Sequence, residues 1–172
     1  FRTWIVSGGE VGFMRAWSES VYGIPPEQVI GTRLALTYRD TAHGPVLEQQ
    51  PSIEALVDGP GKAVAIEQII GRRPLAAFGN SDGDQQMLSW TMAGHGPRFA
   101  LLVHHTDAKR EWAYDRNSPV GQLDRALDQA QHDGWTVVDM AKDWRVVHPV
   151  WPAPTPTPEA RRPDYGSPAG TR

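Results

Sequence analysis

A short apolar run, residues 75–78, ends abruptly in a turn that carries oxygen donors, residues 79–84, and a helical pattern follows at once. A strand that ends in such a turn before a helix is typical of α/β proteins, which present functional side chains at the carboxyl ends of buried strands. The segment therefore predicts an α/β fold with a polar site at this turn.

Strand-like and helix-like segments alternate along the rest of the chain. Buried strands are expected at residues 3–6, 75–78, 99–103 and 135–138, and helices at 10–22, 62–70 and 84–92. A further helix, marked by Leu123, Leu127 and Ala130, is expected to be closed by Gly134. In the helix at 62–70, the buried face is expected to consist of Ala63, Ile66, Ile69 and Ile70. A small hairpin is expected where residues 34–38 and 46–48 flank a turn. Alternation of this kind predicts a mostly parallel sheet flanked by helices.

Composition narrows the functional classes. A chain of 172 residues with 40% hydrophobic and 22% charged residues suits one soluble domain. A net charge of −3 gives no basic surface for nucleic acid or for a membrane. The chain has no cysteine, which excludes disulfides, thiolate metal sites and cysteine nucleophiles. No apolar run approaches the ~20 residues that a membrane-spanning helix needs.

The composition changes near residue 150, where prolines become frequent and apolar residues become rare. This predicts a folded domain over residues 1–149 and a Pro-rich, disordered tail over residues 150–172.

Ser7 and Gly8 stand at the end of the first expected strand, just before a helix. A hydroxyl group and backbone N–H groups at this position can bind a phosphate oxygen. The alternative is that Ser7 only caps the helix.

Lys62 begins a helix after the turn at residues 58–61. The helix dipole disfavours a cation at this position, and stabilisation of a bound phosphate would give a reason for it. The alternative is an exposed lysine tolerated in a loop. A Walker P-loop is excluded, since the required glycine offset is missing.

The turn at residues 79–84 offers Asn80, Asp82 and Asp84 as oxygen donors, which suit Mg²⁺. A calcium-binding EF-hand is excluded by the position of the glycine and by Thr91 at the twelfth position. The alternative is a structural turn in which Asp84 caps the next helix.

A second polar group follows the strand at residues 99–103. His104 and His105 are adjacent, so they should point to opposite faces, with one buried and the other exposed. With Asp107, they are expected to be structural, with substrate contact as the minority alternative. The charged segment at residues 110–116 is expected to be a solvated or salt-bridged surface.

Three motifs occur in an order that resembles the haloacid dehalogenase superfamily, in its phosphoserine-phosphatase-like branch. The second motif of that family matches residues 5–9, the third Gly61-Lys62, and the fourth residues 79–84 with Met87. The segment at 22–31 is also similar to this branch, and the resemblance extends through residues 103–107 and 111–116 to about residue 149. It implies a Rossmann-like core with Mg²⁺ as cofactor and a small phosphorylated substrate.

The resemblance also implies a mechanism and a role for each matched residue. An aspartate attacks phosphorus, and water then hydrolyses the aspartyl-phosphate. Ser7 and the backbone N–H of Gly8 would hold the phosphoryl oxygens, and Lys62 would neutralise charge. Asn80 and Asp84 would contact the metal, with Asp82 as a further candidate because Asn80 replaces the aspartate of the commoner pattern.

The first motif of the family, Asp-x-Asp-x-Thr/Ser, does not occur in this chain. We therefore expect a C-terminal part of a phosphatase whose nucleophile and cap lie upstream of Phe1, inactive by itself. The missing strand would lie between those ending at Ser7 and Phe78, so its absence leaves two unpaired edges and favours aggregation. The alternative is a non-catalytic phosphate- or metal-binding module of the same fold. Compartment, substrate identity and oligomeric state do not follow from the sequence.

Overall fold

The computed structural model describes residues 1–148, and the predicted tail at 150–172 lies outside the described residues. The elements along the chain are β1 (Ile5–Glu10), α1 (Val11–Arg15), α2 (Ser18–Tyr22), η1 (Pro26–Gln28), β2 (Val29–Thr41), β3 (Gly44–Ala55), α3 (Pro60–Ile70), β4 (Ala76–Gly79), η2 (Asp82–Asp84), α4 (Gln85–Met92), β5 (Phe99–His104), α5 (Arg125–Asp133), β6 (Thr136–Asp139) and α6 (Met140–Asp143). This order confirms a mixed α/β fold with a parallel sheet flanked by helices.

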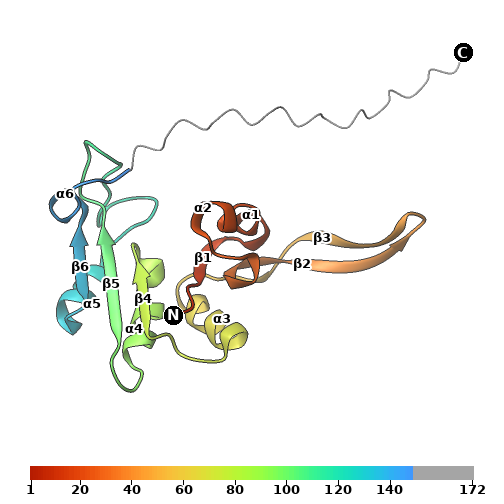
Figure 1. The fold of residues 1–172 in the computed structure, drawn as a ribbon, viewed down its shortest axis with the longest axis horizontal. Coiled ribbons are helices and arrows are strands. Elements are labelled where there is room, and N and C mark those ends of the chain that lie inside the picture. Colours follow the sequence, from red (N-terminus) through yellow and green to blue (C-terminus); the bar gives the residue numbers. More distant parts are fainter. Residues whose placement is uncertain (149–172) are drawn as a thin grey trace, which may run out of the picture.

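The strands form two separate three-stranded sheets (Figure 1). In the first, β1 pairs in parallel with β2, and β2 pairs antiparallel with β3. In the second, β4, β5 and β6 are all parallel. Within residues 1–148, β1 has β2 as its only hydrogen-bonded neighbour and β4 has only β5, so each keeps one edge unpaired.

Helices α3 and α4 connect the two sheets. Helix α3 packs on β1 and β2, α4 packs on β4 and β5, and the two helices pack against each other. One hydrophobic core results, with Ile30 and Ile66 on one side and Leu88 and Leu102 on the other. The two sheets therefore belong to one folded unit, although their strands do not pair with each other.

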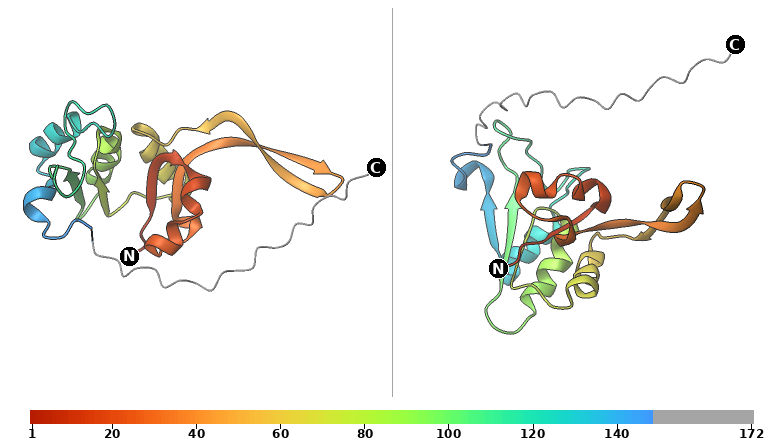
Figure 2. Two further views of the ribbon diagram at one scale, coloured as in Figure 1. Left: turned by 90° about the horizontal axis from the view of Figure 1, so that it is seen from above. Right: turned by 45° about the vertical axis from the view of Figure 1, so that its right-hand side comes forward.

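The hairpin is much longer than the predicted pair of strands at 34–38 and 46–48. Strand β2 begins at Val29, where it pairs with β1, and continues to Thr41 before β3 returns to Ala55. Its outer part extends away from the body of the molecule (Figures 1 and 2). The predicted hairpin was too short because β2 has two different surroundings. Its first residues are buried and pair in parallel with β1, whereas its later residues form an exposed ribbon with β3.

The single helix predicted over residues 10–22 is wrong, since two short helices, α1 and α2, occupy this segment. Trp17 interrupts them with a non-helical φ of −133°. Its side chain packs against the small core cluster of Val11, Met14 and Val29. The break lets this large side chain turn inward, while Phe13 stays 69% exposed.

Two predictions of burial are also wrong. In β4, Ala77 is buried but Phe78 is 60% exposed, because helices cover one face of this sheet and its outer edge has no partner. In α3, Ala65 and Ile66 are buried together with Lys62, whereas Ile69 is 45% exposed. The helix is rotated so that the lysine, rather than the last apolar residues, faces inward.

None of the helices within residues 1–148 has the length and apolar character to span a bilayer.

Candidate functional site

Lys62 and Asp84 form a buried ion pair at the carboxyl end of β4. The Lys62 Nζ atom lies 2.6 Å from Asp84 Oδ1, and the side chains are only 9% and 5% exposed. Lys62 comes from the first turn of α3, and Asp84 ends η2, so the contact between α3 and α4 brings them together. The interpretation of Lys62 as an exposed loop residue is therefore wrong.

The second carboxylate oxygen of Asp84 binds the turn that precedes it. Asp84 Oδ2 accepts hydrogen bonds from the backbone N–H of Asn80 at 2.9 Å and of Ser81 at 3.2 Å. The carboxylate thus folds back against the end of β4, where a Cβ atom on Gly79 would collide with Cβ of Asp84. Gly79 is required for this close approach, and Asp84 makes no side-chain cap to the following helix.

Asn80 is held by a residue from a distant loop. Its Nδ2 group donates a hydrogen bond of 2.5 Å to Tyr114 Oη. Burial raises the pKa of the Tyr114 phenol, the hydrogen bond from Asn80 opposes this, and the charges of Glu111 and Asp84 raise it further. Tyr114 is therefore a neutral phenol at neutral pH. With its amide nitrogen engaged, Asn80 keeps Oδ1 without a hydrogen bond among the described residues.

The two histidines support this loop. The His105 ring stacks on Tyr114 with centroids 4.5 Å apart, and His105 Nδ1 lies 2.7 Å from Glu111 Oε2. His104 Nε2 lies 3.1 Å from Asp115 Oδ2. The prediction of one buried and one exposed histidine is wrong: their side chains are 17% and 21% exposed, since the loop after β5 covers both.

Asp82 contacts helix α5 rather than the ion pair. Its Oδ1 atom accepts hydrogen bonds from the backbone N–H of Asp124 and of Ala126, both at 2.9 Å. Burial raises the pKa of Asp82, but these hydrogen bonds and the charge of Arg125 outweigh it and hold the pKa below its ordinary value. Asp82 therefore stabilises the start of α5, which the prediction of a metal ligand did not anticipate.

Ser7 and Gly8 lie within the last residues of β1. Ser7 Oγ accepts a hydrogen bond from Gly9 N at 3.1 Å. Ser7 does not cap α1, because Glu10 does so, accepting from Gly12 N at 2.8 Å and Phe13 N at 2.7 Å. These backbone hydrogen bonds also lower the pKa of Glu10.

Asp58 is a carboxylate that sequence reasoning did not select. A Cβ atom on Gly8 would lie 3.7 Å from Asp58 Oδ1, and one on Gly83 would lie 2.5 Å from it. The Asp58 carboxylate is therefore adjacent both to the end of β1 and to η2, which follows β4. The carboxyl ends of these two strands lie on the same side of the molecule. The sequence Asp58-Gly59-Pro60 before Lys62 was the only signal, since it places a carboxylate directly before the lysine helix.

The charged segment at 110–116 forms ion pairs, which was one of the two alternatives predicted for it. Arg110 binds Asp107, and Arg116 binds Asp124 at 2.5 Å and Asp128 at 2.7 Å. Hydrogen bonds from Arg110 lower the pKa of Asp107.

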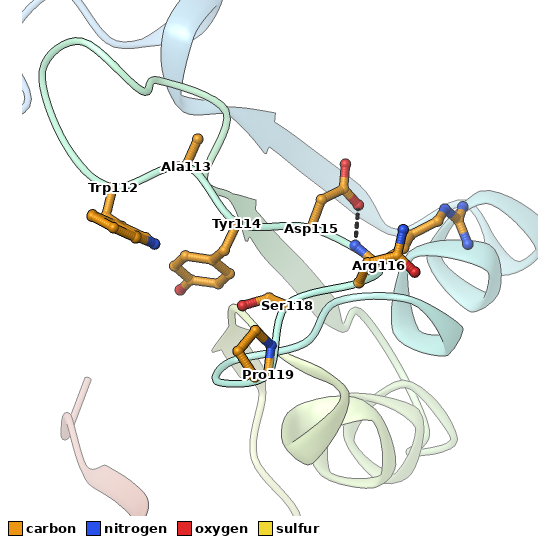
Figure 3. Close-up of a pocket in the computed structure, with 8 residues that line it drawn as sticks. Trp112, Ala113, Tyr114, Asp115, Arg116, Ser118 and Pro119 are labelled. Atoms are coloured by element: carbon orange, nitrogen blue, oxygen red, sulfur yellow. Dashed lines mark hydrogen bonds between the residues drawn. The ribbon is translucent and has the colours of Figure 1, made fainter.

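A shallow hollow beside Tyr114 is lined by residues 112–119 of this one loop (Figure 3). Its lining contains Trp112 and Pro119 and no residue of the strand-end site other than Tyr114. It therefore adds no catalytic group to the site.

The donors at the turn fit only part of a Mg²⁺ site. Asn80 Oδ1 and the Asp84 carboxylate are hard oxygen donors of one turn, of the kind that Mg²⁺ prefers. Within residues 1–148, however, no three His, Asp or Glu side chains gather in an arrangement that could hold a metal ion. Any Mg²⁺ at this turn needs at least one further ligand.

No protein-family model matches this chain, and a search of curated proteins finds no significant similarity.

Proposed function

We propose that this chain is the C-terminal part of a Mg²⁺-dependent phosphatase that hydrolyses small phosphate monoesters through an aspartyl-phosphate. The observation that carries the proposal is the Lys62–Asp84 ion pair of 2.6 Å at the end of β4. A buried ammonium group at a strand end is suited to stabilise the charge of a phosphoryl group. The buried carboxylate of Asp84 fixes the position of this lysine.

Within residues 1–148, β1 and β4 each have one unpaired edge, and these edges support the location proposed for the nucleophile. A strand between them, parallel to both, would satisfy the free N–H and C=O groups of both edges. The carboxyl ends of β1 and β4 meet near Asp58, so such a strand would end among Ser7, Lys62 and Asp84. We propose that this strand carries the nucleophilic aspartate and comes from a segment outside these 172 residues.

Each group at the strand ends then has a role. Ser7 Oγ and the backbone N–H of Gly8 donate hydrogen bonds to phosphoryl oxygens. Lys62 balances the charge between nucleophile and phosphoryl group during attack. The carboxylate attacks phosphorus as the substrate alcohol leaves, and water then hydrolyses the acyl-phosphate.

Tyr114 supports the assignment of Asn80 as a metal-facing residue. By accepting from Nδ2, Tyr114 orients the amide so that Oδ1 is the free donor. Asn80 and Asp84 would hold Mg²⁺ together with the nucleophile strand, and the ion would supply charge to offset that of the phosphate. We do not include Asp82 in this set, because Asp82 binds the start of α5.

The reading frame immediately upstream of Phe1 tests the proposal. An in-frame Asp-x-Asp-x-Thr/Ser after an apolar strand supports the phosphatase. A start codon directly before Phe1 would contradict it and leave a non-catalytic phosphate- or metal-binding module.

A further inference from the structure

Two arginines stand at the amino ends of neighbouring parallel strands, Arg73 shortly before β4 and Arg98 directly before β5. Figure 1 shows the loop that joins α4 to β5 at this end of the second sheet, opposite to the arrowheads of its strands. Lys62 and Asp84 lie at the carboxyl end of β4, so the two arginines are outside the strand-end site. Helix α4 follows Asp84 at one end of the sheet and ends beside Arg73 at the other.

Arg73 has a structural use at the end of α4. Its Nη1 atom donates a hydrogen bond of 2.8 Å to the backbone oxygen of Trp90, and its guanidinium carbon lies 4.7 Å from the centroid of the Trp90 ring. The last carbonyl groups of a helix favour a nearby cation, so one positive charge at this point is accounted for. The two contacts also hold the guanidinium of Arg73 in one position.

Arg98 brings a second positive charge to the same place. A Cβ atom on Gly94 would lie 2.9 Å from Nη2 of Arg98 and 3.0 Å from Cδ of Arg73, so the two arginine side chains lie side by side. The same Cβ atom would collide with Nε of Arg98, so glycine at position 94 leaves the space that this guanidinium needs. The Nε atom is buried and has no hydrogen-bond partner among the described residues.

No carboxylate neutralises the two arginines. Both side chains are partly buried, and within residues 1–148 neither forms an ion pair with an aspartate or a glutamate. Two like charges held close together repel each other, and a buried N–H group without an acceptor is unfavourable. An anion between the two guanidinium groups would be attracted by both of them and would supply the missing acceptor.

We propose that Arg73 and Arg98 form a binding site for a small oxyanion that carries a phosphate or a carboxylate group. The planar fork of N–H groups on arginine matches the oxygen atoms of both groups. Arg98 binds the anion with its unpartnered N–H groups, and Arg73 adds those that its hydrogen bond to Trp90 leaves free. The site goes beyond the proposed phosphatase activity and does not depend on it.

The arginine Nε–H signals of the 172-residue chain, observed by NMR, test the proposal. Phosphate and malonate are titrated separately at an ionic strength kept constant with chloride, which distinguishes a phosphate ligand from a carboxylate one. The Nε–H signal of Arg98 and the amide signal of Gly94 should shift and saturate with at least one of the two anions. Arg33, which pairs with Glu54, is the control whose signal should not move. Equal shifts at Arg33, or none at Arg98 with either anion, would overturn the proposal.

Arg98→Gln supplies a second readout. It should weaken binding of the anion about 10-fold or more, because it removes charge-assisted hydrogen bonds. Without the anion, its free energy of unfolding should equal or exceed that of the wild type, since a partly buried charge without a counter-ion is removed. Arg33→Gln should bind the anion as the wild type does. A marked loss of stability in Arg98→Gln without the anion would show a structural arginine and overturn the proposal.

Phosphate is also the group proposed to bind at Ser7 and Gly8, and the two sites give separate signals. Phosphate shifts at Arg98 and Gly94 should persist in Ser7→Ala. Shifts at the amides of Ser7 and Gly8, with none at Arg98 with either anion, would overturn the arginine site and leave the phosphatase proposal standing.

Discussion

Lys62 and Asp84, which stand 22 residues apart in the chain, meet as a 2.6 Å ion pair between the first turn of α3 and the end of η2. The pair lies where α3 meets α4, the contact that holds the two sheets together. A buried ion pair adds little net stability by itself, but removal of one partner leaves an uncompensated charge. We interpret Lys62 and Asp84 as a pair that serves function rather than stability.

Loss of either partner alone should therefore destabilise the protein strongly. Lys62→Met and Asp84→Leu should each lower the free energy of unfolding by about 3–5 kcal/mol in urea titrations. The double variant Lys62→Met/Asp84→Leu should cost much less than the sum. The control is Lys142→Met, because Lys142 pairs with Asp139 while 80% exposed and should change stability by less than ~1 kcal/mol. Strictly additive effects would show that the pair is not coupled.

Gly79→Ala should disrupt the turn that positions Asp84. The added methyl group would overlap Cβ of Asp84, which folds back over the end of β4. We expect a loss of about 2 kcal/mol or more in unfolding free energy. Gly8→Ala is the comparison, since its methyl group meets only ordinary contacts, the nearest at 3.7 Å. Equal stability of the two variants would argue against the packing described for Asp84.

Removal of the Asp82 carboxylate should weaken the start of α5. Asp82→Ala loses the hydrogen bonds to Asp124 N and Ala126 N and should cost about 1–2 kcal/mol at pH 7. The folded-state pKa of Asp82 lies below the ordinary value of 3.8. The ionised form therefore stabilises the fold above about pH 4, and this stabilisation is lost as pH falls through the folded pKa.

Unfolding titrations at a series of pH values from 7 downwards test whether the stabilisation by Asp82 is lost in acid. The difference in stability between the wild type and Asp82→Ala should narrow below about pH 4. A difference that grows as the solution becomes more acidic would contradict the assigned contacts.

The unpaired edges make a prediction for amide hydrogen exchange. Strand β5 is paired on both sides, whereas β1 and β4 are each paired on one side within the described residues. In this chain, amides of β1 and β4 should exchange faster than those of β5. In a longer protein that contains the proposed strand, their exchange should slow to the rate of β5. Equal protection in both proteins would mean that the edges do not accept a strand.

The order of strands and helices could be predicted from the sequence because local signals define it. The apolar run at 99–103 predicts β5 close to its observed bounds, and Gly134 predicts the end of α5. The break at Trp17 could not be predicted, since it depends on packing against β2. The length of the β2–β3 hairpin was also missed, because its outer half packs against no hydrophobic core that would require a pattern of buried residues.

The candidate site was predictable in its residues but not in its contacts. Lys62 and Asp84 were selected separately, and no local pattern indicates that they meet. Tyr114 was placed in a surface cluster, although it accepts the hydrogen bond from Asn80 across 34 positions of sequence. Asp82 and Asp84 look equivalent in the sequence, and only the position of α5 distinguishes them.

The proposed phosphatase activity requires Lys62 and Asp84 for phosphoryl transfer. The direct measurement is hydrolysis of a generic aryl phosphate, with Mg²⁺, by the protein that includes the segment upstream of Phe1. We expect Lys62→Ala and Asp84→Asn to lower kcat/KM about 100-fold or more, while the exposed Lys142→Met remains active. Folded Lys62→Ala and Asp84→Asn proteins with unchanged rates would contradict the proposed phosphatase site.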